Sequence, residues 1–133
     1  MSAPGDNLAR LIGAWIGMLR SASPEDLAGI LDENVVWQGL RPEWVCSDRS
    51  QVLRILGRRE GRPPRITRVE AEEFGDRVAI SVEGPDFPTL SGPDEVLLQP
   101  EAPRSLVFTF REGMVVRMES LPSREAAFAA ALG

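Results

Sequence analysis

The hydrophobic pattern of this chain changes from a helical to a two-residue period at the double proline Pro63-Pro64. Before this point apolar residues recur at the three- and four-residue spacing of helices. After it they alternate with polar residues, as in half-buried strands, and glycine-containing turn signals separate the segments. Strands that follow helices and are joined by hairpins predict an α+β domain, in which helices cover one face of an antiparallel sheet.

The first half of the chain contains capping signals that place its helices. Asp6 and Asp48 are typical N-cap residues, and Gln51 lies three residues after Asp48, as in a capping box. In order we expect a helix opened by Asp6, a short helix from Ser23 to about Leu31, a strand over Val35–Trp37, a loop through Pro42 and Trp44, and a helix opened by Asp48 that ends near Gly57.

The second half predicts two hairpins and a final helix. The expected strands are Arg65–Phe74, Arg77–Glu83, Ser105–Arg111 and Met114–Leu121, with turns at Gly75-Asp76 and Glu112-Gly113. Residues 84–103 contain too many prolines and glycines for a regular element. Pro122-Ser123 opens an alanine-rich helix. No repeat or linker divides the chain, so we expect a single domain over residues 1–133.

Three residue types that enzymes use often are missing. The chain has fifteen arginines but no lysine, histidine or tyrosine. Histidine is the usual acid or base at neutral pH, while lysine forms Schiff bases and tyrosine donates protons. Catalysis would therefore depend on carboxylates, one cysteine, hydroxyls, backbone groups or a recruited cofactor. The use of arginine in place of lysine, with abundant Ala, Gly and Pro, indicates codon bias in a GC-rich bacterial genome.

Charge and cysteine content restrict the partners and the compartment. A net charge of −5 disfavours general nucleic-acid binding. The lone Cys46 cannot form an internal disulfide, which fits a reducing cytosol. The N-terminus lacks the pattern of a signal peptide, and no apolar run approaches the length that spans a membrane. We expect a cytoplasmic protein without a membrane partner.

Three sequence segments resemble those of a known superfamily. They are Asp32–Trp37 (DENVVW), Ser47–Leu53 (SDRSQVL) and Leu106–Met118 (LVFTFREGMVVRM). In this order the chain resembles the SnoaL-like branch of the nuclear-transport-factor-2-like superfamily. The resemblance implies a cone-shaped, curved antiparallel sheet of the cystatin-like or SnoaL-like kind, with helices packed on its concave face and a cavity at the open end. Dimers are common in that superfamily, so it also implies a homodimer.

The superfamily contains isomerases, dehydratases, epoxide hydrolases, cyclases and non-enzymatic binders, so the fold does not fix the function. The ketosteroid-isomerase-like members place a catalytic aspartate just after the first strand. Gln38 occupies that position here, and glutamine does not accept a proton at neutral pH. The polyketide-cyclase-like members use an acid/base set that normally includes histidine, which is absent. Neither catalytic set transfers to this chain.

Aromatic residues from three segments predict the wall of an apolar ligand site. Trp15, Trp37 and Trp44 come from the first helix, the first strand and the following loop, which the cone would bring around one cavity. The alternative is that they only fill the core, which helical spacing already explains for Trp15. The ligand-binding residues that we predict are Trp15, Trp37, Gln38, Trp44, Phe108, Met118 and Ser120.

The register of the last strand decides whether a carboxylate enters this cavity. Val116, Met118 and Ser120 share one face, and Val115, Arg117, Glu119 and Leu121 share the other. The first set suits the cavity. A register shifted by one residue would instead turn Arg117 and Glu119 inward, which makes Glu119 the best candidate for a catalytic, buried carboxylate. We favour a surface or dimer-facing pair.

Other polar features have simpler interpretations. Cys46 lacks an activating histidine, so we expect an inert thiol. Glu70, Glu72 and Glu73 read as a solvated strand face, and so do the arginines between Arg54 and Arg68 around their loop. We expect neither a metal site nor a cofactor.

Three functions remain open at this point. The first is a small-molecule-binding domain for an apolar ligand, without dedicated acid/base machinery. The second is a cyclase-, isomerase- or hydrolase-like enzyme that uses Glu119 or another carboxylate on a lipid-like or polyketide-like substrate. The third is a protein-interaction module. We also expect the homodimer to use the open face of the sheet, where Val107, Val115 and Leu121 would supply apolar surface.

Overall fold

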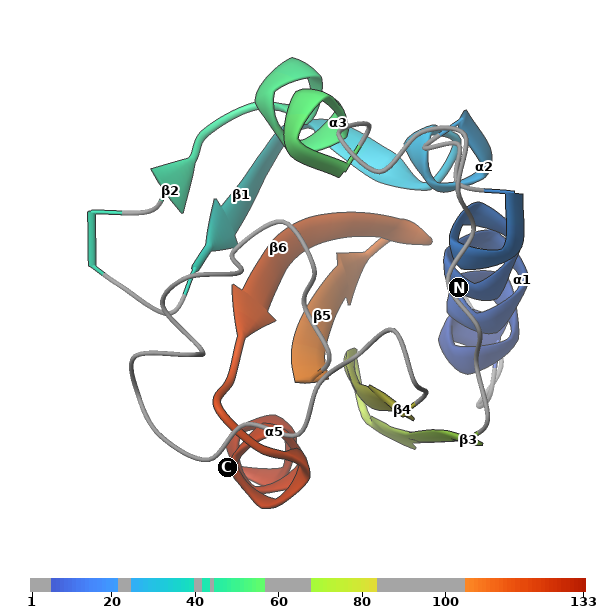
Figure 1. The fold of residues 1–133 in the computed structure, drawn as a ribbon, viewed down its shortest axis with the longest axis vertical. Coiled ribbons are helices and arrows are strands. Elements are labelled where there is room, and N and C mark those ends of the chain that lie inside the picture. Colours follow the sequence, from blue (N-terminus) through green and yellow to red (C-terminus); the bar gives the residue numbers. More distant parts are fainter. Residues whose placement is uncertain (1–5, 22–24, 40–41, 44, 57–67, 84–104) are drawn as a thin grey trace.

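A computed structural model describes residues 6–21, 25–39, 42–43, 45–56, 68–83 and 105–133, without the side chains of some residues in the helices and at strand ends. The described elements are α1 (Asp6–Ser21), α2 (Glu25–Ala28), β1 (Leu31–Gln38), β2 (Val45–Cys46), α3 (Arg49–Leu56), β3 (Arg68–Phe74), β4 (Arg77–Glu83), β5 (Ser105–Arg111), β6 (Met114–Ser120) and α5 (Arg124–Leu132) (Figure 1). The predicted α+β class is confirmed. In this part of the chain no helix is long and apolar enough to cross a membrane.

The strands form one curved sheet in the order β2-β1-β6-β5-β4-β3. Strands β3 to β6 form the predicted antiparallel meander. The sheet is nevertheless mixed, because β1 pairs with β6 in parallel while β2 pairs with β1 in antiparallel. The first long strand therefore lies beside the last one, although about eighty residues separate them in the sequence.

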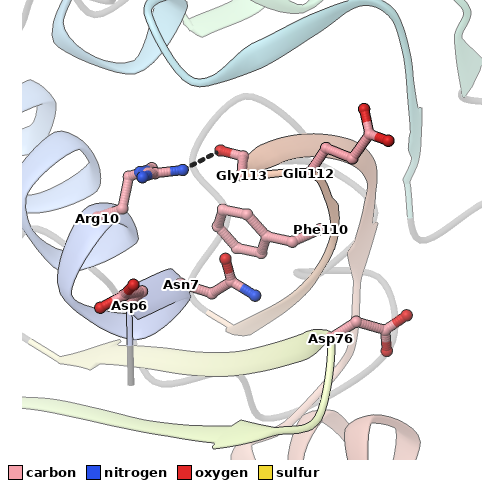
Figure 2. A pocket seen from close by; sticks show the side chains of 7 residues that line it. All are labelled: Asp6, Asn7, Arg10, Asp76, Phe110, Glu112 and Gly113. Carbon is pink, nitrogen blue, oxygen red and sulfur yellow. Dashed lines mark hydrogen bonds between the residues drawn. The ribbon is translucent and has the colours of Figure 1, made fainter. Parts of the chain in front are cut away.

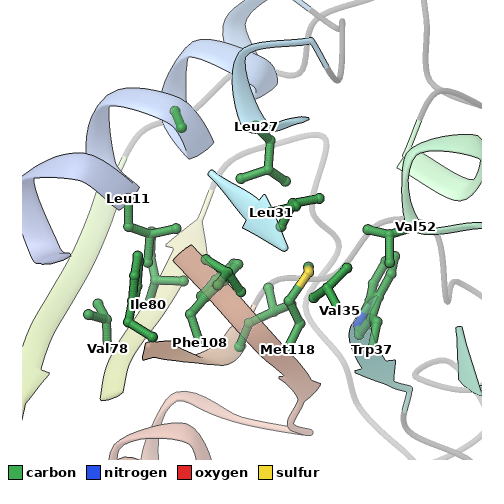
Figure 3. Packing of buried hydrophobic residues seen from close by; sticks show 14 of the residues in the cluster. Leu11, Leu27, Leu31, Val35, Trp37, Val52, Val78, Ile80, Phe108 and Met118 are labelled. Atoms are coloured by element: carbon green, nitrogen blue, oxygen red, sulfur yellow. The ribbon is translucent and has the colours of Figure 1, made fainter. Parts of the chain in front are cut away.

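The main core fills the concave face of the sheet. Figure 1 shows α1, α2 and α3 on this side. The fully buried side chains include Leu11 of α1, Val52 of α3 and Phe108 of β5 (Figure 3). The predicted inward residues of β4 and β5 belong to this cluster: Val78, Ile80, Val82, Leu106, Phe108 and Phe110. The period-two pattern after the double proline is thus explained by burial on one face.

The last helix is an exception to the prediction that helices cover the concave face. Helix α5 packs on β3, β4 and β5 from the convex side (Figure 1). A second, smaller cluster lies beneath it, with Ala79, Val107, Ala127 and Ala131 buried. Ser123 opens the helix as predicted, because its hydroxyl accepts a hydrogen bond from the Ala126 amide at 3.1 Å.

This placement removes the apolar surface that we expected a dimer to use. Val107 is buried beneath α5, and Leu121 packs against the same cluster. Val115 is fully buried in the main core instead. All three side chains are therefore covered within one chain. The homodimer itself remains a prediction.

Val115 changes face because β6 contains a bulge. Thr109 pairs with Arg117, but the next residue of β5, Phe110, pairs with Val115, so β6 has one extra residue at this point. Val115 and Met118 consequently both face the core, and Val116 is only half-buried. Strict alternation correctly predicted that Met118 and Ser120 face inward. It wrongly predicted that Val116 faces the core and that Val115 faces away from it.

Three local expectations in the first half are wrong. The second helix ends at Ala28, and Leu31, which we placed in that helix, begins β1. Strand β1 is longer than the predicted Val35–Trp37, because its start pairs with β6 through Leu31 and Val115. Val45 and Cys46 form a short strand rather than loop. The residues Arg65, Ile66 and Thr67 of the predicted third strand, and the irregular segment 84–103, lie outside the described residues.

Candidate functional site

Three neighbouring strands bring part of the predicted ligand wall together. Met118 of β6 pairs with Trp37 of β1 on one side and with Phe108 of β5 on the other. Figure 3 shows the three side chains on the same face of the sheet, in the main core. Phe108 and Met118 are 0% exposed and Trp37 is 4% exposed. The wall is therefore apolar and closely packed at this level.

One polar pair lies at the edge of this wall. The indole Nε1–H of Trp37 donates a hydrogen bond to the Ser120 hydroxyl, with 2.9 Å between nitrogen and oxygen. Ser120 is half-buried, whereas Trp37 and Met118 next to it are buried. A serine hydroxyl that accepts one hydrogen bond still has its own hydrogen to donate. The Ser120 hydroxyl is thus a hydrogen-bond donor in apolar surroundings.

Gln38 does not join this wall. In the parallel pairing Gln38 lies opposite Glu119, and both alternate with residues that face the core. Gln38 and Glu119 are therefore half-buried neighbours on the convex face. The side-chain amide of Gln38 donates to the Gly39 carbonyl at 3.2 Å.

The register also places Arg117 on the convex face, where it is exposed and lies opposite Val36 and Thr109. The shifted register that would turn Arg117 and Glu119 inward is not the one in the structure. Glu119 consequently lies on the other side of the sheet from Trp37 and Met118.

The other two predicted tryptophans cannot be placed. Trp44 lies outside the described residues, and so does the side chain of Trp15, although its backbone belongs to α1. Cys46 is buried opposite Trp37, which fits an unreactive thiol. Among the described residues, no group of three or more Cys, Asp or Glu side chains could hold a metal ion.

An open cleft of about 650 Å³ lies at the opposite end of the sheet (Figure 2). It is formed where the first turn of α1 meets the two hairpin turns. Its lining includes Asn7, Arg10, Asp76, Phe110, Glu112 and Gly113. Because β6 runs from Met114 at the turn to Ser120, the cleft and the Trp37–Ser120 pair are roughly 20 Å apart.

The turn Glu112-Gly113 shapes this cleft. Both residues have positive φ angles, 53° and 82°, as in the type I′ turns that close two-residue hairpins. The Arg10 guanidinium donates a hydrogen bond from Nη1 to the Gly113 carbonyl at 2.7 Å. A Cβ atom on residue 113 would overlap this guanidinium, so the close approach needs a glycine.

A buried amide in the cleft has an unsatisfied oxygen. Asn7 is 9% exposed, and its Oδ1 has no hydrogen-bond partner in the part of the chain that the structure describes. Figure 2 shows this oxygen on the side of Arg10 and Phe110. A buried acceptor without a donor costs about 1–3 kcal/mol, so such groups are uncommon in folded proteins.

This cleft is not among the sites predicted from the sequence. In the sequence, Asn7 belongs to the start of a helix, whereas Asp76 and Glu112 belong to two different turns. Only the tertiary structure brings them together, because the two hairpin turns lie side by side next to α1. A polar residue at a buried helix position is a signal that could have been noticed, since Asn7 precedes Leu8 and Leu11 on the apolar stripe.

The acidic residues of β3 take part in contacts of the fold. Glu73 accepts a hydrogen bond from the backbone N–H of Leu8, at 2.8 Å. Glu70 pairs with Arg124 of α5 and with Arg68, the latter at 2.6 Å. The hydrogen bond from Arg124 lowers the pKa of the Glu70 carboxyl below its ordinary value.

Comparison with known proteins gives structural matches only. Neither a family model nor a curated protein sequence matches the chain. An NTF2-like protein from Anabaena variabilis is 10% identical and has a TM-score of 0.64, over 96% of this chain and 97% of that one. A cystatin-fold protein from Novosphingobium aromaticivorans is 15% identical, with a TM-score of 0.60 over 86% and 97%.

A third match is a protein with a ketosteroid isomerase-like fold from Catenulispora acidiphila, in complex with trimethylamine. It is 14% identical, with a TM-score of 0.56 over 98% of this chain and 94% of that chain. At such identities these matches show the fold and leave the function open.

Proposed function

Because the chain has the nuclear-transport-factor-2-like fold, we propose that it binds a small, mainly apolar molecule with one hydrogen-bond-accepting group, without acid/base catalysis. The site would lie at the Trp37–Ser120 end of the concave face. The observation that carries this proposal is the Ser120 hydroxyl, which already accepts from the indole and keeps one hydrogen to donate.

The composition of the core supports an apolar ligand. The buried members of the main cluster are aliphatic or aromatic side chains, with Cys46 as the one thiol. A pocket with apolar walls and a few placed polar groups is typical of small-molecule sites. A ligand carbonyl that reaches the Ser120 hydroxyl would therefore be oriented by one hydrogen bond. The trimethylamine complex is an example of a small molecule bound to a protein of similar fold.

The position of Glu119 argues against the enzymatic alternative. A general base must come within hydrogen-bond distance of the proton that it abstracts. Glu119 lies beside Gln38 and Val107 on the convex side, so the sheet separates it from Trp37 and Met118. The proposal consequently gives Glu119 no role in ligand binding.

A matched pair of neutral probes tests the proposal. 2-Acetylnaphthalene carries a carbonyl acceptor, and 2-ethylnaphthalene has nearly the same shape without one. Tryptophan quenching should saturate with both, and the ketone should bind about two- to tenfold more tightly, the ratio that one neutral hydrogen bond gives. Ser120→Ala should remove the difference between the probes, and Ser120→Thr should keep it.

Affinity should be nearly constant from about pH 6 to 9, because carboxylates of ordinary pKa are ionised over this range. Glu119→Gln should bind both probes as the unaltered protein does. Equal affinities for the two probes, or no saturable quenching by either, would contradict the proposal. A turnover that disappears in Glu119→Gln would establish the enzymatic alternative in its place.

A further inference from the structure

We propose that the cleft between the start of α1 and the two hairpin turns is a second binding site, for a small organic cation with N–H groups, of the guanidinium or primary ammonium class. This inference is independent of the proposed function, because the cleft lies at the other end of the sheet from Ser120.

The unsatisfied amide oxygen of the cleft requires a hydrogen-bond donor. Asn7 Oδ1 is buried in the wall of the cleft and has no donor among the described residues. The free energy that this oxygen costs is recovered when a ligand supplies an N–H or O–H group. The occupant must therefore be a hydrogen-bond donor.

The charged groups around the cleft favour a positively charged occupant. Three carboxylates line it, those of Asp6, Asp76 and Glu112, against the single guanidinium of Arg10. Asp76 and Glu112 are exposed, and Figure 2 shows their carboxylates pointing outward at the rim. Charges at a rim attract an ion of opposite sign and raise its rate of association. The occupant is therefore a cation.

An anion is disfavoured although a helix begins here. The N-terminus of a helix attracts anions through its unpaired backbone N–H groups. In α1 the Leu8 N–H already donates to the Glu73 carboxylate, and Asp6 places a further negative charge in the first turn. The chain itself therefore supplies the negative charges that this helix end attracts.

The position of Arg10 shows that the cleft accommodates a planar cation. Its guanidinium rests against Gly113 and donates to the carbonyl of that residue. Arg10 is exposed, and its side chain makes this one hydrogen bond among the described residues. A free guanidinium ion can bind beside it, or displace it from the same carbonyl, with the Phe110 ring in the wall between Asn7 and Gly113 (Figure 2).

Titration with methylguanidinium chloride, followed by amide chemical shifts at constant ionic strength, tests this site. We expect saturable shifts at Asn7, Phe110 and Gly113. Tetramethylammonium has the same charge but no N–H group, and it should bind at least about tenfold more weakly, as expected for the loss of a charge-assisted hydrogen bond. Equal binding of both ions, preferential binding of Ca²⁺, or binding of sulfate at these residues would overturn the proposal.

Variants separate the roles of the lining residues. Asn7→Leu should weaken methylguanidinium binding about tenfold or more. Without ligand it should raise the midpoint of thermal unfolding, because it removes an unsatisfied buried group. Asp76→Asn and Glu112→Gln should each weaken binding about twofold and reduce its salt dependence. Glu125→Gln, an exposed carboxylate on α5, is the matched control and should change nothing.

Two further variants keep the test decisive. Should Asn7→Leu fail to fold, Asn7→Asp retains the acceptor and should bind methylguanidinium at least as tightly as the unaltered chain. Arg10→Gln removes the cation that competes for the Gly113 carbonyl, so it should tighten binding several-fold. Weaker binding in Arg10→Gln, or unchanged binding in a folded Asn7→Leu variant, would overturn the proposal.

Discussion

The hydroxyl of Ser120 satisfies the only polar hydrogen of the Trp37 indole. The indole is 4% exposed, so its N–H has little access to water and depends on this acceptor. A buried donor that loses its partner keeps the full cost of leaving water. This single contact therefore couples the stability of the fold to the proposed ligand site.

Ser120→Ala should lower the free energy of unfolding by about 1–2 kcal/mol, because the Trp37 N–H loses its acceptor. Urea unfolding measures this difference. Ser120→Thr keeps the hydroxyl and should be closer to the unaltered protein. Ser50→Ala, an exposed position on α3, is the control. A Ser120→Ala variant as stable as this control would show that water satisfies the indole.

At the scale of an element, the β5–β6 hairpin depends on two residues in the left-handed region. Glu112 adopts a φ of 53°, which asparagine or glycine tolerates better than glutamate, and Gly113 adopts 82°. Glu112→Asn should therefore stabilise the protein by roughly 0.5 kcal/mol.

Gly113→Ala should destabilise the protein by about 1–2 kcal/mol, since a residue with a Cβ atom is strained at this positive φ. The Arg10 guanidinium, which a Cβ atom would overlap, is the end of an exposed, flexible side chain and can move aside. Both effects are measured by urea unfolding. If Gly113→Ala were neutral, the turn would have to differ from the type I′ geometry described above.

Helix α5 is joined to β3 by an ion pair that should make its packing sensitive to acid. The hydrogen bond from Arg124 lowers the pKa of Glu70 in the folded protein below its ordinary value. The pair thus stabilises the fold above about pH 4.5 and ceases to do so as the pH falls through the lowered pKa.

The unfolding midpoint of Glu70→Gln should accordingly lie below that of the unaltered protein at pH 7, and the two should converge as the pH falls through the lowered pKa of Glu70. High salt should also reduce the difference at pH 7, because the pair is near the surface. Glu33→Gln, at an exposed position on β1, should show no such convergence. A pH-independent difference between Glu70→Gln and the unaltered protein would exclude the ion pair as its cause.

Some elements were predictable from sequence because local pattern and burial agree. The alternating residues of β4 and β5 are buried on one face, as their period indicates, and Ser123 caps α5. Strand β1 was only partly recognised, because Asp32, Glu33 and Asn34 are poor strand formers and the pairs with β6 lie on either side of them, at Leu31 and from Val36 onward. The bulge at Val116 has no sequence signature.

The same holds for the candidate sites: features set by local pattern were predictable, and features set by tertiary contacts were not. Trp37, Phe108, Met118 and Ser120 were correctly expected to share a face, since strand alternation determines it once the register is known. Gln38 was included through a resemblance in position, although it is adjacent to Trp37 and must therefore face the other way. The cleft around Asn7 arises from turns and a helix end that are distant in sequence, so no local pattern predicts it.

At the scale of the whole molecule, α5 leaves part of the convex face uncovered. Val45 on the edge strand β2 is 47% exposed, and Val36 of β1 is half-buried on the same face. The sequence led us to expect a homodimer. Because Val107 and Leu121 are covered, we now expect its contact surface to lie in this uncovered area. Sedimentation at micromolar concentration should then give twice the chain mass.

Val45→Asp should shift that equilibrium to the monomer, since it places a charge in the contact area. Asp is tolerated at an exposed edge position, so the fold should persist and circular dichroism should be unchanged. A strict monomer in the unaltered protein, or a dimer insensitive to Val45→Asp, would contradict this assignment.

The parallel pairing of β1 with β6 has a consequence during synthesis. Leu31, Val35 and Trp37 leave the ribosome about eighty residues before their long partner strand, Met114–Ser120. Among the described strands, only the two residues of β2 can pair with β1 in that interval. The nascent chain therefore holds apolar strand residues without their main partner while the intervening residues are made, a state in which chains tend to aggregate and bind chaperones.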